Sequence, residues 1–285
     1  MTKIMKSKDN KFIHKTKALL HISAIELNIT EQCNICCLGC DHAIGIIPNR
    51  NVDKKDIKKD VRSLQQILHT RTIRIIGGEP LLHPNIEEIT GYISEASIAD
   101  SIELWTNGIL LHKIPQKVLE MVDGIVISRY PEQNYEWTQA TLTKYVNQYN
   151  VWINIRDCNY FTWSYKFQPI GKSPLTEIVY ANCREAYTCN TVRNGKFYKC
   201  VQSAFATDRL SAYGVVLKDE GICLHNNPQV VGEIKQLLRC RKPMAACSYC
   251  LGEFGSQFRH RQVRTTQLDE CIQAEFDVNF IYPSI

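Results

Sequence analysis

Between residues 22 and 157, short apolar runs alternate with amphipathic ones, which is the rhythm of repeated βα units with parallel strands. The segment 52–68 has apolar residues at helical spacing: Ile57, Val61, Leu64 and Leu68. The predicted strands are 22–29, 72–76, 101–105, 124–128 and 151–157, and the predicted helices are 52–68, 84–96, 116–122 and 136–148. The pattern therefore predicts an α/β fold built on a parallel sheet.

The βα rhythm is lost after residue 180. The stretch CNTVRNGKFYKC (189–200) predicts a β-hairpin, because Asn194-Gly195 is a strong type I′ turn signal flanked by alternating residues. A helix at about 230–239 precedes the sequence CSYC at 247–250. We therefore expect a basic N-terminal arm (1–20), a βα domain (21–180) and a smaller C-terminal domain (181–285).

Composition narrows the possible partners and the compartment. The chain of 285 residues has a net charge of +5, and six lysines lie within its first 17 residues, so the remainder is nearly balanced. This is too little clustered charge for a nucleic-acid surface. No run of about 18 apolar residues is present, and the N-terminus lacks the apolar run of a signal peptide. We expect a cytoplasmic protein with no nucleic-acid and no membrane partner.

Thirteen cysteines in such a chain favour metal binding or redox chemistry over disulfides. Residues 33–40 read CNICCLGC, four thiols in eight positions. Three of them can bind three irons of a 4Fe-4S cluster and leave the fourth iron free. Two registers fit, with either Cys37 or Cys36 between Cys33 and Cys40, and a structural zinc site is the alternative.

The register C-x3-C-x2-C after a first strand, with GGEP (77–80) after the second strand and TNG (106–108) after the third, resembles the radical S-adenosylmethionine (SAM) superfamily. The resemblance covers residues 22 to about 157. It implies a partial parallel (β/α)6 barrel of radical SAM type. It also implies that Cys33, Cys37 and Cys40 hold the cluster, that Cys36 is not a ligand, and that the open iron binds SAM.

The same resemblance assigns a SAM cradle at the carboxyl ends of the strands. Glu79 would bind the methionine ammonium, while Gly77 and Gly78 allow close backbone approach. The other residues that the resemblance implies for SAM binding are Pro80, Asn107, Ser128 and Arg156. Ser128 as a helix cap and Arg156 as a surface ion-pair partner are the structural alternatives. The family often has an aromatic residue just before the third cysteine, where this chain has Gly39, so we expect different adenine contacts.

A second set of cysteines, Cys183, Cys200, Cys247 and Cys250, resembles the Twitch form of the SPASM extension, which implies a β-hairpin plus helix domain with an auxiliary 4Fe-4S cluster. Counting outward from the turn places Cys189 opposite Cys200, so Cys189 can replace Cys183 as the ligand. Zinc is the alternative here too. Four thiolates leave no open iron, which favours electron transfer. The His260–Gln262 segment is predicted to line a substrate pocket near this cluster.

A single auxiliary cluster in a chain of this length resembles the subfamily that includes 2-deoxy-scyllo-inosamine dehydrogenase and neomycin epimerase. The resemblance implies hydrogen abstraction from a hydroxylated small molecule, followed by oxidation or epimerisation, with a flavodoxin- or ferredoxin-type reductant. The alternatives are a ribosomally made peptide substrate, which the short segment before the first strand disfavours, and a non-catalytic iron-sulfur electron carrier. No motif fixes a catalytic side chain; Arg156 and Cys189 are the candidates.

Overall fold

The structure is a computed structural model that describes residues 20–170, 174–264 and 267–268. The predicted N-terminal arm therefore lies almost wholly outside the described residues. Five parallel strands follow one another across the sheet: β1 (Leu20–Thr30), β2 (Leu68–Gly77), β3 (Ala99–Thr106), β4 (Gly124–Arg129) and β5 (Trp152–Asp157). This confirms the predicted α/β class, and every predicted strand forms.

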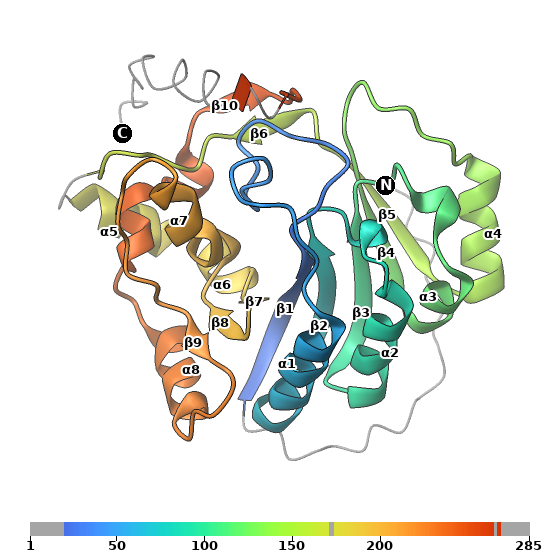
Figure 1. Cartoon of the computed structure of the whole chain (residues 1–285), viewed down its shortest axis with the longest axis horizontal. Coiled ribbons are helices and arrows are strands. Elements are labelled where there is room, and N and C mark those ends of the chain that lie inside the picture. Colours follow the sequence, from blue (N-terminus) through green and yellow to red (C-terminus); the bar gives the residue numbers. More distant parts are fainter. Residues whose placement is uncertain (1–19, 171–173, 265–266, 269–285) are drawn as a thin grey trace.

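The helices between these strands cover one face of the sheet (Figure 1). They are α1 (Lys54–Ile67), α2 (Ile86–Ala96), α3 (Gln116–Met121) and α4 (Gln139–Tyr149), with short 3-10 turns η1 (Pro80–Leu82) and η2 (Leu111–Lys113). Asp53 begins α1 by accepting a hydrogen bond from the backbone of Lys55. Leu68, predicted on this helix, begins β2 instead and remains buried.

The two faces of the sheet differ because the side chains of a strand alternate. In β1, Ile25, Leu27 and Ile29 join the core under the helices. Between them, Glu26 and Asn28 point to the other face. The same alternation continues across the sheet. The face under the helices, here called the outer face, is apolar, and the opposite inner face carries most of the polar side chains.

The sheet continues beyond β1 into the C-terminal part of the chain. Strand β7 (Thr191–Arg193) pairs in parallel with β1 and then turns into β8 (Lys196–Tyr198), which pairs with β9 (Ile222–Cys223). Asn194 and Gly195 both have positive φ, which confirms the predicted type I′ hairpin. The predicted boundary at residue 180 falls within α5 (Pro174–Asn182), and one sheet spans both sides of it.

The remaining elements gather around the hairpin and above the carboxyl ends of the strands. They are α6 (Glu185–Thr188), α7 (Val201–Ser211), α8 (Val230–Arg239), η3 (Ala245–Tyr249) and η4 (Gly252–Phe254). Strand β6 (Tyr160–Thr162) pairs with β10 (Gln257–Arg259) in a separate antiparallel ribbon. Figure 1 shows this ribbon near the upper end of β1, beside the loop that follows it.

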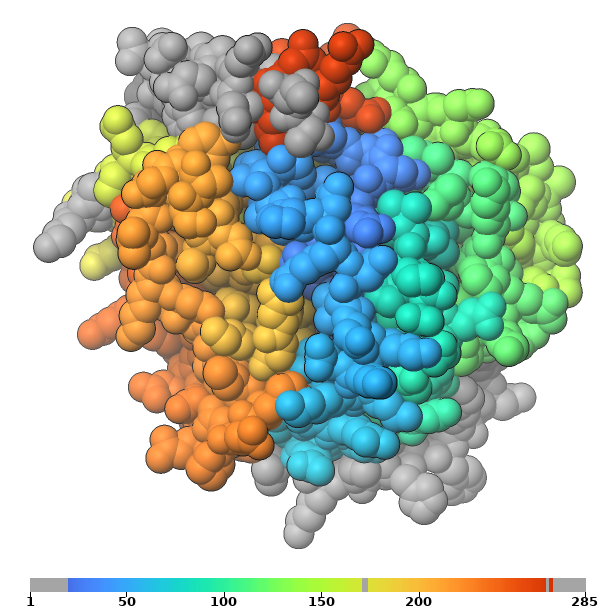
Figure 2. Space-filling model, in the orientation of Figure 1, coloured from blue at the N-terminus to red at the C-terminus, as the bar shows by residue number. Residues whose placement is uncertain are grey.

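The first strand, its loop and α1 lie between the C-terminal elements and the later βα units, as the blue surface between orange and green shows in Figure 2. The cysteine loop is thus held from both sides. None of the helices in the described ranges is both long and apolar enough to cross a membrane.

Candidate active site

A cavity of about 680 Å³ opens at the carboxyl ends of the parallel strands. Its wall combines the cysteine loop, the ends of β2 to β5 and the segment that leads into β7. Ligand sites of parallel α/β sheets form at this edge, because the loops that follow the strands converge there. The predicted residues that line the cavity are Cys33, Cys37, Cys40, Gly77, Gly78, Asn107, Ser128, Arg156 and Cys189.

The cysteine loop brings three thiols to this one cavity. Cys33, Cys37 and Cys40 all line it, whereas Cys36 does not and places its sulfur against Gly45. Burial raises the pKa of the Cys33 thiol to about 12 and that of Cys37 further. Negative charge on neighbouring cysteines adds to the effect for both. The placement of the sulfurs is the one that the register with Cys37 requires.

The two glycines of GGEP let β2 end directly against the cysteine loop. A Cβ at Gly77 would stand 2.3 Å from the carbonyl oxygen of Thr30, and one at Gly78 would stand 2.1 Å from that of Gln32. Gly78 also donates its backbone N–H to Thr30, and Glu79 donates to Gln32. Any side chain would push the two segments apart, so these glycines fix the loop as well as opening the cavity.

Glu79 lies behind the cavity wall rather than on it. Its carboxylate is fully buried and accepts hydrogen bonds from the backbone of Leu81 (3.0 Å), the hydroxyl of Thr106 (2.8 Å) and the backbone of Asn107 (2.8 Å). Burial raises its pKa to about 7. Pro80, also predicted to bind SAM, is buried and does not line the cavity. The geometry shows Glu79 tying GGEP to TNG.

Asn107 connects TNG to the cysteine loop. Its amide nitrogen donates to the side chain of Asn34 at 2.6 Å and lies 3.8 Å from the sulfur of Cys33. Its side-chain oxygen accepts from the backbone of Ile109 at 3.0 Å, which fixes the orientation of the amide. The ends of β1, β2 and β3 are therefore cross-linked immediately around the first cysteine.

Ser128 and Arg156 lie side by side on β4 and β5 and both line the cavity. No helix begins at Ser128; its hydroxyl hydrogen-bonds the thiol of Cys158, which also lines the cavity. The guanidinium of Arg156 lies 5.2 Å from the ring centre of Trp105. Neither residue is a buried structural group, and both remain predicted SAM-binding residues.

A polar wall faces the cavity from the inner face of the sheet. Arg74 donates to the buried Glu26 at 3.2 Å and lies over the ring of Trp105 at 4.8 Å. The hydroxyl of Thr191 donates to the second oxygen of Glu26, at 3.0 Å. The Nε of Arg74 is buried without a hydrogen-bond partner among the described residues. Alternating polar positions in apolar strands, as in AIELNI (24–29), were the sequence signal for this wall.

Asp41 and His42, directly after the third cysteine, also line the cavity. Asp41 is half-buried and accepts a hydrogen bond from the hydroxyl of Ser164 at 3.0 Å. Burial lowers the pKa of His42 to about 4, so its ring is neutral at physiological pH. The His42 ring contacts Phe205 edge-on at 5.3 Å between ring centres.

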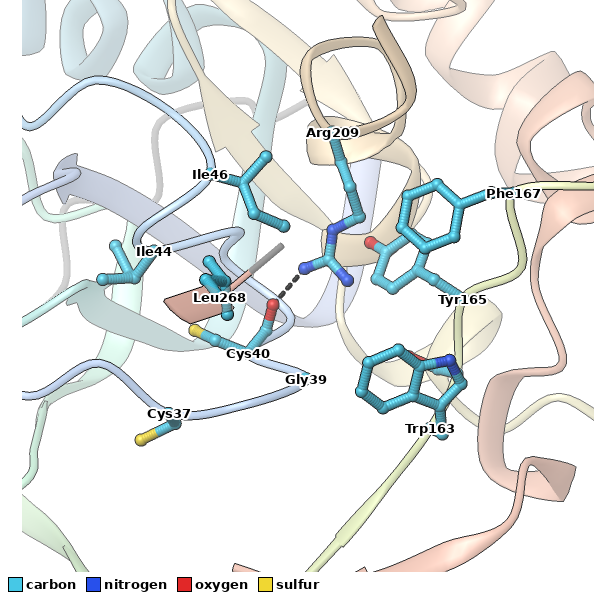
Figure 3. Close-up of a pocket in the computed structure, with 11 residues that line it drawn as sticks. Cys37, Gly39, Cys40, Ile44, Ile46, Trp163, Tyr165, Phe167, Arg209 and Leu268 are labelled. Atoms are coloured by element: carbon cyan, nitrogen blue, oxygen red, sulfur yellow. Dashed lines mark hydrogen bonds between the residues drawn. The ribbon is translucent and has the colours of Figure 1, made fainter. Parts of the chain in front are cut away.

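Arg209 holds the cysteine loop from the C-terminal side (Figure 3). Its guanidinium donates to the carbonyl of Cys40 and lies 3.5 Å from the ring centre of Tyr165. The hydroxyl of Tyr165 in turn donates to the carbonyl of Gln202 on the same helix, α7. Arg209 is only 3% exposed, so this contact is internal to the protein. Sequence reasoning did not single it out.

The space beside Gly39 is filled by aromatic side chains from elsewhere in the chain. A Cβ at Gly39 would stand 3.0 Å from Phe258 and 3.4 Å from Trp163, and the backbone there has φ of +70°. Glycine is therefore required both by the turn and by these neighbours. Where the family often has an aromatic residue in the chain itself, Phe258 of β10 packs against this position.

Four further cysteines line a second, much smaller pocket, which we call the closed pocket because four thiolates would leave no iron of a cluster open. Cys183, Cys200, Cys247 and Cys250 all line a pocket of about 20 Å³. The rest of its wall is largely apolar: Val179, Tyr180, Ala186, Met244 and Ala246. Burial raises the pKa of Cys200 to about 12 and that of Cys247 to about 11. The backbone N–H of Gly252 donates to the sulfur of Cys250 at 3.3 Å.

Cys189 does not join these four cysteines. The hairpin register pairs Thr191 with Tyr198, and the strands end there, before Cys189 and Cys200. Cys189 instead lines the large cavity near Glu26 and Glu185. Between the two alternatives for the second site, the structure places Cys183 with the other three thiols.

The donor sets fit iron-sulfur clusters. Three thiols at the open cavity leave one iron free, whereas four thiols at the closed pocket leave none. Each cysteine of such a cluster binds a different iron, so the sulfurs are spread around a cube. Within the part of the chain that the structure describes, no three His, Cys, Asp or Glu side chains are arranged around a single metal ion.

These features define an α/β protein with a thiol-rich cavity at the carboxyl ends of its parallel strands. Residues 27–129 match the model of the radical SAM superfamily. Curated relatives are named GTP 3′,8-cyclase. That of Methanococcus maripaludis (strain S2), named as probable, is 40% identical over 99 residues, which is 34% of this chain and 32% of the relative. The match to the relative from Chlorobaculum tepidum is 29% identical over 121 residues, or 42% and 36%.

The chain thus spans only about a third of the length of these curated relatives. Among solved structures, BtrN in complex with AdoMet and 2-DOIA has a TM-score of 0.50 at 17% identity, covering 80% of this chain and 92% of BtrN. Streptococcus suis SuiB bound to its precursor peptide SuiA has a TM-score of 0.41 at 15% identity, covering 83% and 72%. The likeness to BtrN shows a shared fold.

Proposed function

We propose that this protein is a radical SAM enzyme that oxidises or epimerises a carbon centre of a hydroxylated small molecule of the sugar or aminocyclitol type. The observation that carries the proposal is the single cavity shared by three thiols, the GGEP and TNG segments and the charged inner face of the sheet. An electron carrier has no need of such a cavity. When bound, the reduced cluster and SAM would supply a 5′-deoxyadenosyl radical that abstracts a hydrogen atom.

The chain's own groups divide the cavity into two ends. At the cysteine-loop end, Cys33, Cys37 and Cys40 would hold the first 4Fe-4S cluster, while Gly77 and Gly78 leave room for SAM beside it. Asn107, Ser128 and Arg156 line the adjoining wall and would bind the polar parts of SAM. In this proposal Glu79 positions Asn107 from behind and is also the group predicted to attract the methionine ammonium.

At the other end, charged side chains would bind the substrate. Glu26, Arg74 and Glu185 offer acceptors and donors within one wall, which suits several hydroxyl or amino groups. The Nε of Arg74 makes no hydrogen bond among the described residues and lies 3.9 Å from a carboxylate oxygen of Glu103, so it can donate to a substrate oxygen. Glu26 is buried, whereas Arg74 and Glu185 are half-buried, so this wall is only partly exposed to water.

The second site would serve electron transfer. Cys183, Cys200, Cys247 and Cys250 would hold an auxiliary 4Fe-4S cluster with no open iron. Gln202 and Gly252 line both the closed pocket and the large cavity, so the two sites share a wall. This proximity supports transfer of one electron to the auxiliary cluster from the carbon radical that hydrogen abstraction leaves. Loss of the hydroxyl proton to water or a base then gives a ketone.

Epimerisation would instead need a hydrogen-atom donor, for which Cys189 is the candidate. Its thiol lines the cavity, and burial beside the acidic groups Glu26 and Glu185 raises its pKa well above the ordinary value. It therefore keeps its hydrogen at neutral pH. Cys158 is a second thiol on the cavity wall, beside Ser128.

Other features of the proposal concern partners and alternatives. We propose a flavodoxin- or ferredoxin-type reductant, a cytoplasmic setting and no nucleic-acid partner. Modification of a ribosomally made peptide remains the alternative substrate class, since the cavity is open to solvent on the side of exposed Tyr160. Cyclisation of GTP, the reaction in the relatives' name, is not carried over, because the matches cover about a third of their length.

The test is anaerobic turnover after cluster reconstitution, with SAM, dithionite and a panel of polyols, amino sugars and aminocyclitols in heavy water. We expect 5′-deoxyadenosine together with either a ketone lacking solvent deuterium or an epimer carrying one deuterium at the inverted carbon. Deuterium at a peptide α-carbon, or a cross-linked peptide, in a parallel peptide panel would overturn the substrate class. Intact clusters without any SAM cleavage would favour the electron-carrier alternative.

A further inference from the structure

The C-terminal segment 257–263 packs along the cysteine loop. Leu38 donates its backbone N–H to Arg261, Val263 donates to Cys36, and Cys37 forms an isolated antiparallel bridge with Gln262. The segment predicted to line a pocket near the second cluster thus lies against the first cysteine site. It brings one polar ring, that of His260, to the middle cysteine of the loop.

His260 is held rigidly in this position. It is 6% exposed, and its backbone N–H donates to the carbonyl of Asn159 at 2.8 Å. Its ring lies 4.7 Å from that of Tyr130 and 4.9 Å from that of Phe161, measured between ring centres. Its Nε2 lies 3.1 Å from the sulfur of Cys37. An imidazole nitrogen is therefore in contact with a cysteine sulfur of the first site.

The chemistry of a cluster ligand fixes the direction of this contact. A cysteine sulfur bound to iron is a thiolate and can only accept a hydrogen bond, so the ring must carry its hydrogen on Nε2. A reduced cluster carries one more negative charge than an oxidised one. An N–H group aimed at a ligand sulfur therefore stabilises the reduced form and raises the reduction potential.

We propose that His260 is a positioning residue that donates a hydrogen bond to the sulfur of Cys37 and raises the reduction potential of the first cluster. The proposal rests on the proposed function in one respect, the assignment of Cys37 as a cluster ligand. It gives the C-terminal segment a role in SAM activation. Arg209 differs, because it binds the carbonyl of Cys40 rather than a sulfur.

The experiment compares variants that keep or remove the donor. His260→Phe keeps the aromatic packing with Tyr130 and Phe161 but has no N–H, whereas His260→Gln can place an amide N–H near the position of Nε2. His260→Asn has the same amide on a chain too short to reach. His21→Phe, at the start of β1 and opposite to the cysteine loop, is the matched control.

The reconstituted full-length protein would be titrated with dithionite-based redox buffers while electron paramagnetic resonance follows the cluster signal that SAM addition alters. Iron is counted in every sample. At a potential where the wild-type first cluster is half reduced, we expect His260→Phe and His260→Asn to lower the reduced-to-oxidised ratio about fivefold. His260→Gln and His21→Phe should match the wild type. If Phe at this position prevents cluster loading, comparison of the reduced-to-oxidised ratios of His260→Gln and His260→Asn tests the proposal.

Equal potentials in wild type, His260→Phe and His260→Asn, with full iron content, would overturn the proposal. So would a more positive potential in both variants. Failure of the proposed function has a different signature: no cluster signal in the wild type would respond to SAM, whatever residue occupies position 260.

Discussion

The two cysteine sites are built in opposite ways. The first takes three thiols from one loop of eight residues and presents them to a cavity of about 680 Å³. The second takes four thiols from three separate segments, which line a pocket of about 20 Å³ with largely apolar walls. Both hold thiols whose pKa is raised by burial.

In the proposed function, this difference would separate SAM cleavage at the first site from electron transfer at the second. A loop that ends a strand can offer three sulfurs on one side and leave the other side open, because the neighbouring strands end at the same edge. Four thiols from separate segments would occupy all four irons of a cluster and leave no place for a further ligand. Access, rather than the type of ligand, distinguishes the two sites.

The largest effect is expected from Cys37→Ala, which tests the open site. It removes the middle ligand of the open site, so we expect loss of about half of the iron and complete loss of 5′-deoxyadenosine formation. Iron and sulfide analysis, with product detection by chromatography, would check both. Retention of SAM cleavage in this variant would show that the register is wrong.

Cys250→Ala tests the closed site. We expect loss of the auxiliary cluster with SAM cleavage retained within about tenfold, because the cavity keeps its three thiols. Oxidised product should disappear if this cluster accepts the substrate's electron. Parallel loss of both clusters, seen as near-zero iron in well-folded protein, would mean that the sites do not assemble separately.

Arg209→Met removes the contact that joins helix α7 to the cysteine loop. A buried charged hydrogen bond contributes about 1.5–3 kcal/mol, so we expect a matching fall in the free energy of unfolding of the cluster-free protein. Arg209→Lys should recover only part of the lost free energy of unfolding, because a Lys ammonium cannot replace the planar guanidinium that lies over the ring of Tyr165. Chemical denaturation provides the measurement, and an unchanged unfolding midpoint in Arg209→Met would contradict this role.

Glu79→Gln should change the pH dependence of stability. The pKa of Glu79 is raised from 4.5 to about 7 by burial, so the folded protein binds its proton more tightly than the unfolded chain does. Its contribution is full below about pH 4.5 and is lost as the pH rises through 7. The difference in melting temperature between wild type and Glu79→Gln should therefore change with pH between about 4.5 and 7. A constant difference would argue against the raised pKa.

The smallest effects on iron content are expected from Cys36→Ala and Cys189→Ala. Cys36 does not line the large cavity with the three thiols of its loop, and Cys189 does not line the closed pocket. The iron content should therefore remain at the wild-type value. Loss of iron in Cys189→Ala, with iron retained in Cys183→Ala, would reverse the assignment at the closed site. Both variants would be reconstituted in parallel with wild type.

The sequence predicted the strands and the motif positions because both depend on local signals. Short apolar runs between helical segments located β1 to β5, and Asn194-Gly195 located the hairpin turn. The spacing of CNICCLGC, GGEP and TNG placed three segments at one edge of the sheet. Those inferences needed no knowledge of which distant segments pack together.

The unpredicted parts depend on contacts between distant segments. Nothing local shows that Arg209 reaches the carbonyl of Cys40, or that His260 reaches Cys37. The structural role of Glu79 was not predicted either, because its hydrogen-bond partners Thr106 and Asn107 lie at the end of another strand and directly after it. The parallel pairing of β7 with β1 merges two regions that the sequence pattern separates at residue 180.

The most direct test of the account is the electron paramagnetic resonance spectrum of the reduced, reconstituted Cys250→Ala protein before and after SAM is added. This variant keeps the open site and lacks a ligand of the closed one. The account predicts a clear spectral change on SAM addition, from binding at the open iron, and none in Cys37→Ala. A spectrum of Cys250→Ala that SAM leaves unchanged, with the first cluster fully loaded, would contradict it.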